Sequence, residues 1–217
     1  RDVAPSRGLG DVYKRQIRSR EELEEVTPFQ VDNLLWGTKK IPKTYGYLGF
    51  VPNDGFYLKM ICEEADPLRT YTKDQDPVYQ DSAMEAFFLF ESGKERLPKP
   101  TYLNFEANAN GALIAEYGTE RTYRTRFGKE TRRAFECKAL MEEGEWSVSL
   151  RVPITALEEV YGSLSLGVGS TFSCNFYKLS ETAAVEHYAA YALIPTKIPS
   201  FHMPEYFAEA EIVEGRK

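Results

Sequence analysis

Histidine, cysteine and tryptophan are scarce in this chain of 217 residues, which has two, three and two of them respectively. Neither histidine belongs to a nucleophile signature with serine or cysteine, and no pair of candidate zinc ligands has useful spacing. Cys62, Cys137 and Cys174 lie far apart in apolar alternating runs, so we interpret them as small buried hydrophobic residues. The sequence therefore disfavours nucleophilic and zinc-dependent catalysis, and the odd number of cysteines argues against a fold built on disulfides.

Long apolar runs and an excess of basic residues are also missing. No run approaches the roughly 18 apolar residues that a membrane-spanning helix needs. Asp and Glu outnumber Lys and Arg by 33 to 27, and the sequence pI is about 5.2. Nucleic acids and anionic lipid surfaces require a concentrated basic footprint. The composition therefore predicts no nucleic-acid partner and no membrane partner, and it leaves neutral and cationic ligands open.

The residues that are present favour a single globular domain, because 42% are hydrophobic and 13% are aromatic. Residues 1–16 are basic, lack apolar periodicity and look like a translated adaptor sequence from assembled metagenomic reads. We therefore predict a non-native tail at 1–16 and a domain at 17–217, with the native N-terminus missing. The compartment stays open between the outside of a bacterial cell and its cytoplasm.

Short segments with period-two alternation dominate the domain. The pattern predicts strands at 45–51, 56–66, 83–90, 102–110, 112–118, 122–128, 133–141, 146–152, 164–169 and 171–179, with a charged loop after residue 90. Pro52-Asn53-Asp54-Gly55 is a strong turn signal, and Pro153 suits the first turn of a short helix that continues to residue 161. We predict an all-β fold, an antiparallel β-sandwich with one short helix.

Polar side chains are expected to share one face of two neighbouring strands. Alternation places Asn104, Glu106, Asn108 and Asn110 opposite an apolar face, and it places Glu85 on the same exposed side of the preceding strand. Asn175 has a similar position on a later strand. Because asparagine is depleted in strands, a row of amides and carboxylates suggests a flat array of donors and acceptors for a polyhydroxylated ligand. Two alternatives stay open: the amides satisfy turn backbone near Gly111, or the glutamates form a solvated outer face.

The loop before the first of these strands collects three carboxylates, Asp74, Asp76 and Asp81. Oxygen ligands in a loop suit calcium, although the spacing differs from that of a helix-loop-helix site. The sequence therefore requires no cofactor but allows a calcium ion here, and solvated or turn-capping aspartates are the alternative. Tyr79 in the same loop could stack on a sugar ring, whereas Trp36 is interpreted as a core residue.

Six segments, in this order and spacing, resemble the carbohydrate-binding module family 9-like group of the DOMON-like superfamily. They are 76–88 (DPVYQDSAMEAFF), 102–111 (YLNFEANANG), 146–154 (WSVSLRVPI), 174–178 (CNFYK), 187–191 (HYAAY) and 199–207 (PSFHMPEYF). The resemblance implies a β-sandwich with a sugar site on one face. It also implies a carbohydrate ligand and a place within, or accessory to, a carbohydrate-active enzyme.

The resemblance further implies a set of contact residues. Family members hold the sugar between two tryptophans, whose positions fall at Val78 or Tyr79 and at Phe201 in this sequence. Polar contacts in the family correspond to Glu85, to Glu106 in place of an arginine, to Asn108 and to the strand that carries Asn175. Tyr191 is a further candidate wall. Loss of both tryptophans and of the arginine predicts a smaller stacking platform and a more acidic site.

The function predicted from these residues is non-catalytic recognition of a mono- or oligosaccharide. A hydrolase that uses Glu85 and Glu106 as its carboxylate pair is one alternative. A haem-binding domain is another, because some relatives in the superfamily bind haem through methionine and histidine. The candidate haem ligands are Met60, Met84, Met141, Met203, His187 and His202.

Overall fold

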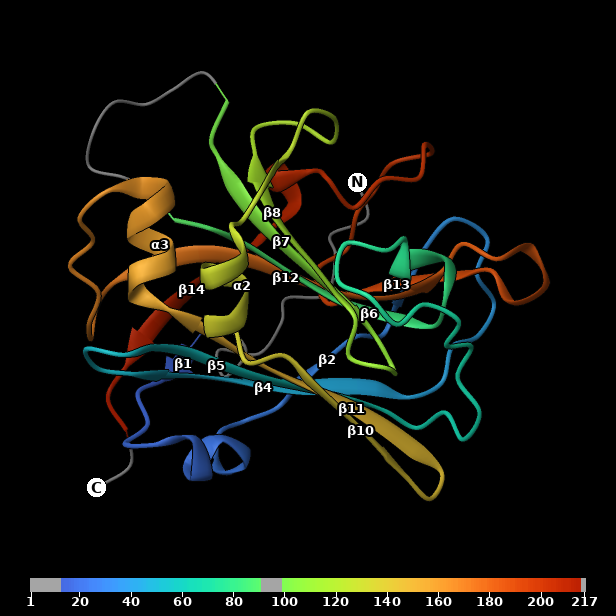
Figure 1. The fold of residues 1–217 in the computed structure, drawn as a ribbon, viewed down its shortest axis with the longest axis horizontal. Coiled ribbons are helices and arrows are strands. Elements are labelled where there is room, and N and C mark those ends of the chain that lie inside the picture. The colour runs from blue at the N-terminus through green and yellow to red at the C-terminus, as the bar shows by residue number, and fades with distance from the viewer. Residues whose placement is uncertain (1–12, 91–98, 216–217) are drawn as a thin grey trace.

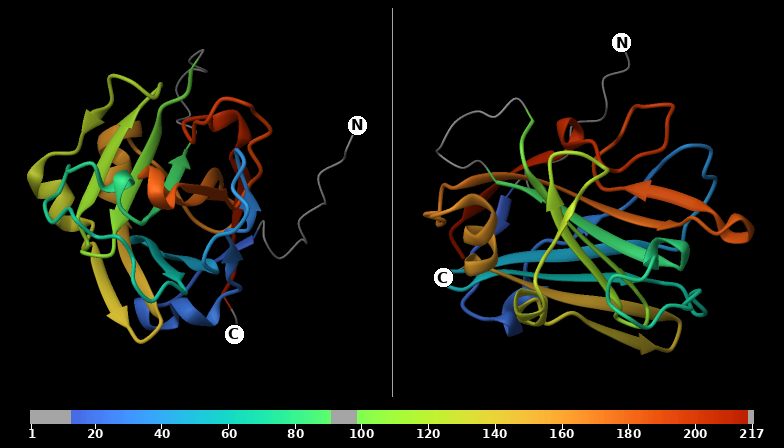
Figure 2. Two further views of the ribbon diagram at one scale, coloured as in Figure 1. Left: turned by 90° about the vertical axis from the view of Figure 1, so that its right-hand side faces the viewer. Right: turned by 45° about the horizontal axis from the view of Figure 1, so that its top comes forward.

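The computed structural model describes residues 13–90 and 99–215, and it consists of two β-sheets packed face to face (Figures 1 and 2). The large sheet has the order β1 (Tyr13–Arg15), β14 (Ala208–Val213), β12 (Thr171–Ser180), β6 (Ala83–Leu89), β7 (Tyr102–Asn108), β8 (Leu113–Gly118) and β9 (Thr125–Arg126), with β13 (His187–Ala190) beside β12 and β3 (Asn33–Leu34) beside β13. The small sheet has the order β10 (Lys138–Glu142), β11 (Glu145–Pro153), β5 (Gly55–Cys62), β4 (Thr44–Val51) and β2 (Phe29–Gln30). The predicted β-sandwich is confirmed.

Helical segments are short and lie outside the sheets. Two are α-helices, α2 (Lys129–Ala134) and α3 (Ile154–Tyr161), the second of which is the predicted one after Pro153. The others are 3₁₀ turns: η1 (Arg20–Glu25), η2 (Val78–Gln80), η3 (Ala183–Val185) and η4 (Pro204–Tyr206). In the part of the chain that is described, no helix combines the length and the apolar character needed to cross a membrane.

The main hydrophobic core fills the space between the two sheets. Alternation along the strands decides which side chains enter it, as predicted: Met84, Ala86 and Phe88 of β6 lie in the core beside Phe105 of β7. From the small sheet, Trp146 is fully buried against them. The odd-numbered positions of β6 and the even-numbered positions of β7 therefore face outward, on the side away from the small sheet.

The turn between β4 and β5 has the predicted sequence chemistry. Asn53 adopts a φ of 60°, Gly55 adopts 154°, and the Asp54 amide donates to the Val51 carbonyl at 3.1 Å. A Cβ atom on Gly55 would lie 2.2 Å from the Val152 carbonyl oxygen, so the close approach of β5 to β11 requires glycine there.

Three predicted strands differ from the observed structure. Residues 164–169 contain no strand, and 122–128 contribute only the two residues of β9. The segment 133–141 is divided between the end of α2 and β10, because the charged run KETRRA forms a helix whose side chains do not enter the core. Tyr13–Arg15, part of the predicted tail, pair in parallel with β14. The rest of that tail (1–12) and the predicted charged loop at 91–98 lie outside the described residues.

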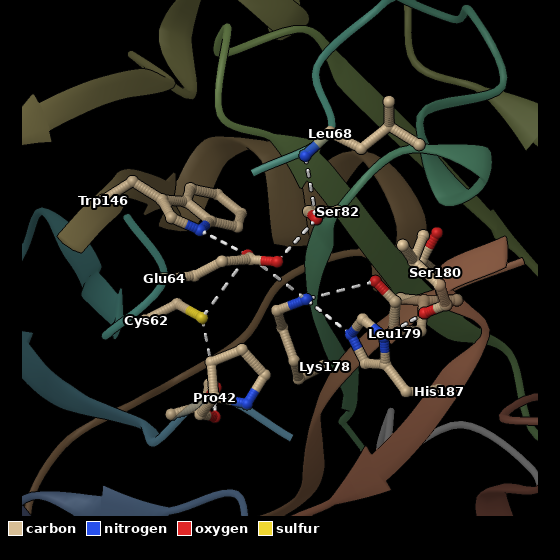
Figure 3. Close-up of polar contacts among 12 residues, drawn as sticks. Pro42, Cys62, Glu64, Leu68, Ser82, Trp146, Lys178, Leu179, Ser180 and His187 are labelled. Carbon is tan, nitrogen blue, oxygen red and sulfur yellow. Dashed lines mark hydrogen bonds and ion pairs between the residues drawn. The ribbon is translucent and has the colours of Figure 1, made fainter. Parts of the chain in front are cut away.

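A buried polar network connects the two sheets (Figure 3). Lys178 of β12 is fully buried, and its Nζ atom lies 2.7 Å from His187 Nε2 and 3.7 Å from the Glu64 carboxylate. Glu64 follows β5 and accepts hydrogen bonds of 2.9 Å from Trp146 Nε1 and Ser82 Oγ. Burial lowers the pKa of Lys178 and of His187. Burial opposes ionisation of Glu64, but the charge of Lys178 and the hydrogen bonds from Trp146 and Ser82 together outweigh it and lower the pKa of that carboxyl.

Replacing Lys178 with methionine should destabilise the protein strongly, because Glu64 would keep its charge without a buried counter-charge. We expect the free energy of unfolding to fall by roughly 3 kcal/mol in urea titrations. Lys43→Met is the matched control, because Lys43 forms an exposed ion pair with Glu63 and should change stability by less than about 0.5 kcal/mol. The double variant Glu64→Gln/Lys178→Met should lose less than the two single losses combined. Additive losses would mean that the two charges do not stabilise each other.

Candidate functional site

A cavity of about 740 Å³ lies on the outer face of the large sheet. This volume is within the usual range of small-molecule sites. Its lining combines carboxylates, guanidinium groups and aromatic rings: Glu85, Glu106, Glu116, Glu181, Arg121, Arg124, Arg126, Trp36, Tyr79, Tyr188 and Phe201. Four of the predicted contact residues, Tyr79, Glu85, Glu106 and Phe201, are therefore brought together in one cavity.

Two of the glutamates that line this cavity are neighbours on adjacent strands. Glu85 of β6 and Glu106 of β7 are direct partners in the antiparallel register and are only 3% and 6% exposed. Burial raises the pKa of Glu85 well above its usual range, and the neighbouring charge of Glu106 adds to the effect. Burial also raises the pKa of Glu106 to about 7. The pair therefore holds at least one proton near neutral pH, so it can donate a hydrogen bond as well as accept several.

Asn104 and Arg124 hold Glu106 in place. Asn104 Nδ2 donates to Glu106 Oε1 at 2.9 Å, and Arg124 Nε donates to Asn104 Oδ1 at 2.8 Å. The Arg124 guanidinium also lies 4.1 Å from the centre of the Tyr102 ring and donates to the Tyr102 carbonyl. Asn104 thus positions a cavity residue and is not itself part of the lining. Arg124 was not predicted as a site residue. It follows β8, and the alternation of polar and apolar residues does not show that this segment contacts β7.

Aromatic residues from distant parts of the chain line the cavity. Phe201 stacks on Tyr177 with 4.1 Å between the ring centres. The ring centre of Trp36 lies 5.5 Å from that of Phe201 and 5.5 Å from that of Tyr188. Trp36 is half-buried and borders the cavity, so its interpretation as a core residue is corrected. Phe201 is only 7% exposed and therefore offers less ring surface to a ligand than Trp36 or Tyr188. The sequence contained no local signal that would join residues 36, 188 and 201.

Asn108, Asn175 and Tyr191 are not brought to the cavity. Asn108 is fully buried and its side chain bonds the Tyr71 carbonyl, Asp81, and the backbone amides of residues 110 and 112. This is the turn-satisfying role that the sequence left open. Asn175 exchanges two hydrogen bonds with the backbone of residue 192. Tyr191 is 2% exposed and packs against Phe29 and Phe176 in the main core.

The three aspartates cap backbone groups separately. Asp81 accepts hydrogen bonds from the amides of Thr70 and Tyr71, Asp74 from the amide of Leu113, and Asp76 from that of Lys73. Across residues 13–90 and 99–215, no cluster of three or more His, Cys, Asp or Glu side chains is arranged to hold a metal ion. The geometry is that of a hydrogen-bonded loop and not of the predicted three-carboxylate calcium site. Calcium binding, which the sequence allows but does not require, stays a prediction.

The two histidines also have protein partners. His187 lies in the network of Lys178, and His202 Nδ1 is 2.9 Å from the Tyr102 hydroxyl. Burial lowers the pKa of His202 to about 3, so the ring is neutral. Met84, on the core face of β6, lies on the opposite side of the large sheet from the cavity. The arrangement gives no support to an axial histidine-methionine pair for haem.

Gln75 carries an unsatisfied amide at the edge of the cavity. Its side-chain oxygen and nitrogen are buried without a hydrogen-bond partner, and its backbone has a φ of 68°. Both features cost free energy, and such costs concentrate at functional sites. Sequence reasoning missed this residue, because neither backbone strain nor an unpaired amide is visible in a residue pattern.

Glu106→Gln should stabilise the protein at alkaline pH. A carboxyl whose folded-state pKa is raised stabilises the fold below about pH 4.5 and loses that contribution as the pH rises through about 7. The glutamine amide cannot ionise and can still accept the bond from Asn104. We therefore expect a gain of roughly 1–3 kcal/mol at about pH 8 and almost none at about pH 4, measured by urea unfolding of both proteins. The same change at both pH values would contradict the assigned ionisation.

Comparison with known proteins identifies the family. A model of carbohydrate-binding family 9 matches residues 20–212. None of the curated proteins compared with the chain matches it. Among solved structures, a candidate carbohydrate-binding protein from Bacteroides uniformis has a TM-score of 0.77 at 20% identity, with 92% of this chain and 97% of that chain covered.

Two further structures come from a family 9 carbohydrate-binding module of Caldicellulosiruptor kristjanssonii. The complex with cellotriose has a TM-score of 0.64 at 11% identity and covers 94% of each chain. The complex with glucose has a TM-score of 0.63 at 12% identity and covers 94% of this chain and 96% of that chain. At such low sequence identities, the solved structures establish only that the fold is shared. The family is established by the family model, because it matches most of the sequence. The chain therefore belongs to carbohydrate-binding family 9.

Proposed function

We propose that this protein is a non-catalytic carbohydrate-binding module that holds a mono- or oligosaccharide in the cavity on the large sheet. The observation that carries the proposal is the juxtaposition of a buried carboxyl pair, Glu85 and Glu106, with aromatic side chains in one cavity of about 740 Å³. A sugar ring presents C–H faces that suit aromatic rings and hydroxyl edges that need donors and acceptors. Family membership and the two Caldicellulosiruptor complexes, with cellotriose and with glucose, support the same ligand class.

Binding is favoured over hydrolysis by the position of the two carboxyl groups. Glycosidases place their carboxylates roughly 5 to 10 Å apart, on opposite sides of the bond to be cleaved. Glu85 and Glu106 are instead direct partners on adjacent strands, close enough for each to shift the pKa of the other. Both carboxyl groups project from the same face of one sheet, which does not place them on opposite sides of a bound glycosidic bond. A role as an accessory module of a carbohydrate-active enzyme would follow from sugar binding without catalysis.

Calorimetric titration of the full chain with glucose and cellotriose, with and without calcium, tests this proposal. We expect saturable binding that Glu106→Ala weakens at least about tenfold, because the cavity loses its central acceptor. Tyr79→Ala should weaken binding roughly fivefold through loss of a stacking surface. Tyr123→Ala is the matched control, because Tyr123 is 99% exposed and does not line the cavity.

Two results would contradict the proposal. One is the absence of binding to any sugar by the folded protein, with calcium present. The other is binding that neither Glu106→Ala nor Tyr79→Ala weakens, which would move the sugar site to another surface.

A further inference from the structure

We propose that the preferred ligand of the cavity is an amino sugar, whose free ammonium group binds at the Glu85–Glu106 pair. This inference rests on the proposed function and specifies the substrate class of the same site. It starts from the absence of a paired counter-charge beside these two buried carboxyl groups. Within residues 13–90 and 99–215, no ion pair joins either of these two carboxyl groups to a lysine or arginine.

The arginines of the cavity are directed to other partners. Arg124 donates a hydrogen bond from Nε to the Asn104 side chain, from Nη2 to the Tyr102 carbonyl and from Nη1 to the Glu120 carbonyl. Arg126 pairs with Glu116 at 3.5 Å. Arg121 is exposed at the rim, where its guanidinium reaches the Pro199 carbonyl at 3.5 Å. A ligand cation can therefore supply a counter-charge that the protein does not place against the carboxyl pair.

The aromatic lining favours a cation for a separate reason. Trp36, Tyr79 and Tyr188 are half-buried and border the same cavity as the carboxyl pair. The faces of aromatic rings attract a cation within about 6 Å, and this attraction strengthens when the cation is removed from water. An amino sugar combines that cation with a C–H face and hydroxyl groups. It therefore uses the aromatic rings and the carboxyl groups together.

Proton linkage gives the proposal a distinctive signature. Burial raises the pKa of both carboxyl groups, so the free site holds a proton near neutral pH. Among the described residues, the other charged or titratable groups that face the pair are Arg121, Arg124, Glu116, Glu181, Tyr79 and Tyr177. An ammonium ion favours the ionised pair, so its binding releases a proton from the carboxyl groups to the buffer. A neutral sugar makes no such demand.

Titrations of the full chain with glucosamine, N-acetylglucosamine, glucose and glucuronate at about pH 7 test the ligand class. We expect glucosamine to bind about tenfold more tightly than glucose or N-acetylglucosamine, a difference of about 1.4 kcal/mol. Its apparent binding enthalpy should depend on the ionisation enthalpy of the buffer, which reveals the released proton. Glu85→Gln should remove this preference while glucose still binds, and Glu143→Gln, in an exposed turn, is the matched control. Monomeric glucosamine and its short β-linked oligomers, compared side by side, distinguish a free sugar from a polysaccharide end.

Several outcomes separate the possible failures. Equal or tighter binding of glucose or glucuronate than of glucosamine would overturn the amino-sugar inference and leave the carbohydrate-binding function intact. Equally tight binding of choline would assign the cavity to cations without a sugar ring, which also overturns the inference. Absence of binding to all four sugars would overturn the proposed function itself. Retention of the glucosamine preference in Glu85→Gln would contradict the assigned position of the ammonium group.

Discussion

The burial of two carboxyl groups opposite each other on one sheet is the constraint on which the site depends. Glu85 and Glu106 face outward because their neighbours in sequence face the core, and the antiparallel register makes them direct partners. Such a pair is costly unless it is protonated, hydrogen-bonded or matched by a ligand. Asn104 donates one hydrogen bond to Glu106, and both carboxyl groups also line a cavity whose walls include aromatic rings. A protein under selection for stability alone would gain by replacing either residue.

Folding and binding use opposite faces of the same large sheet. The inner face contributes phenylalanine, alanine and methionine side chains to the main core. On the outer face, Phe87, Tyr102 and Tyr177 form a second cluster with Phe201 from the C-terminal part of the chain, and this cluster borders the cavity. Stability is supplied mainly by the hydrophobic core between the sheets. The outer face can therefore carry a strained and partly uncompensated set of polar groups without loss of the fold.

The sequence was sufficient to predict much of this arrangement, and the missing parts have a common cause. Period-two alternation identified the inner and outer faces of β6, β7 and β12, because a strand has only two faces. It could not predict what covers an outer face. Asn108 and Asn175 share a face with Glu106 and Glu85, but loop and C-terminal backbone groups bind their amides.

Long-range contacts account for the residues that the sequence did not reveal. Trp36 reaches the cavity through contacts with Tyr188 and Phe201, more than 150 positions away in the chain. No local sequence pattern predicts contacts between residues so far apart in the chain. Arg124 is similar, because its role depends on a hydrogen bond to Asn104 across neighbouring segments. The charged run of α2 was misinterpreted as part of a strand because its short helix contributes no buried side chain.

Carboxyl-carbon NMR of the glutamate side chains, followed against pH with and without sugar, tests the central claim most directly. The account predicts that two glutamates titrate well above the usual range, that these are Glu85 and Glu106, and that the same two signals shift when sugar is added. Titration of every glutamate in the usual pKa range of a glutamate, or sugar-induced shifts confined to other residues, would contradict the claim that the buried carboxyl pair is the centre of the binding site.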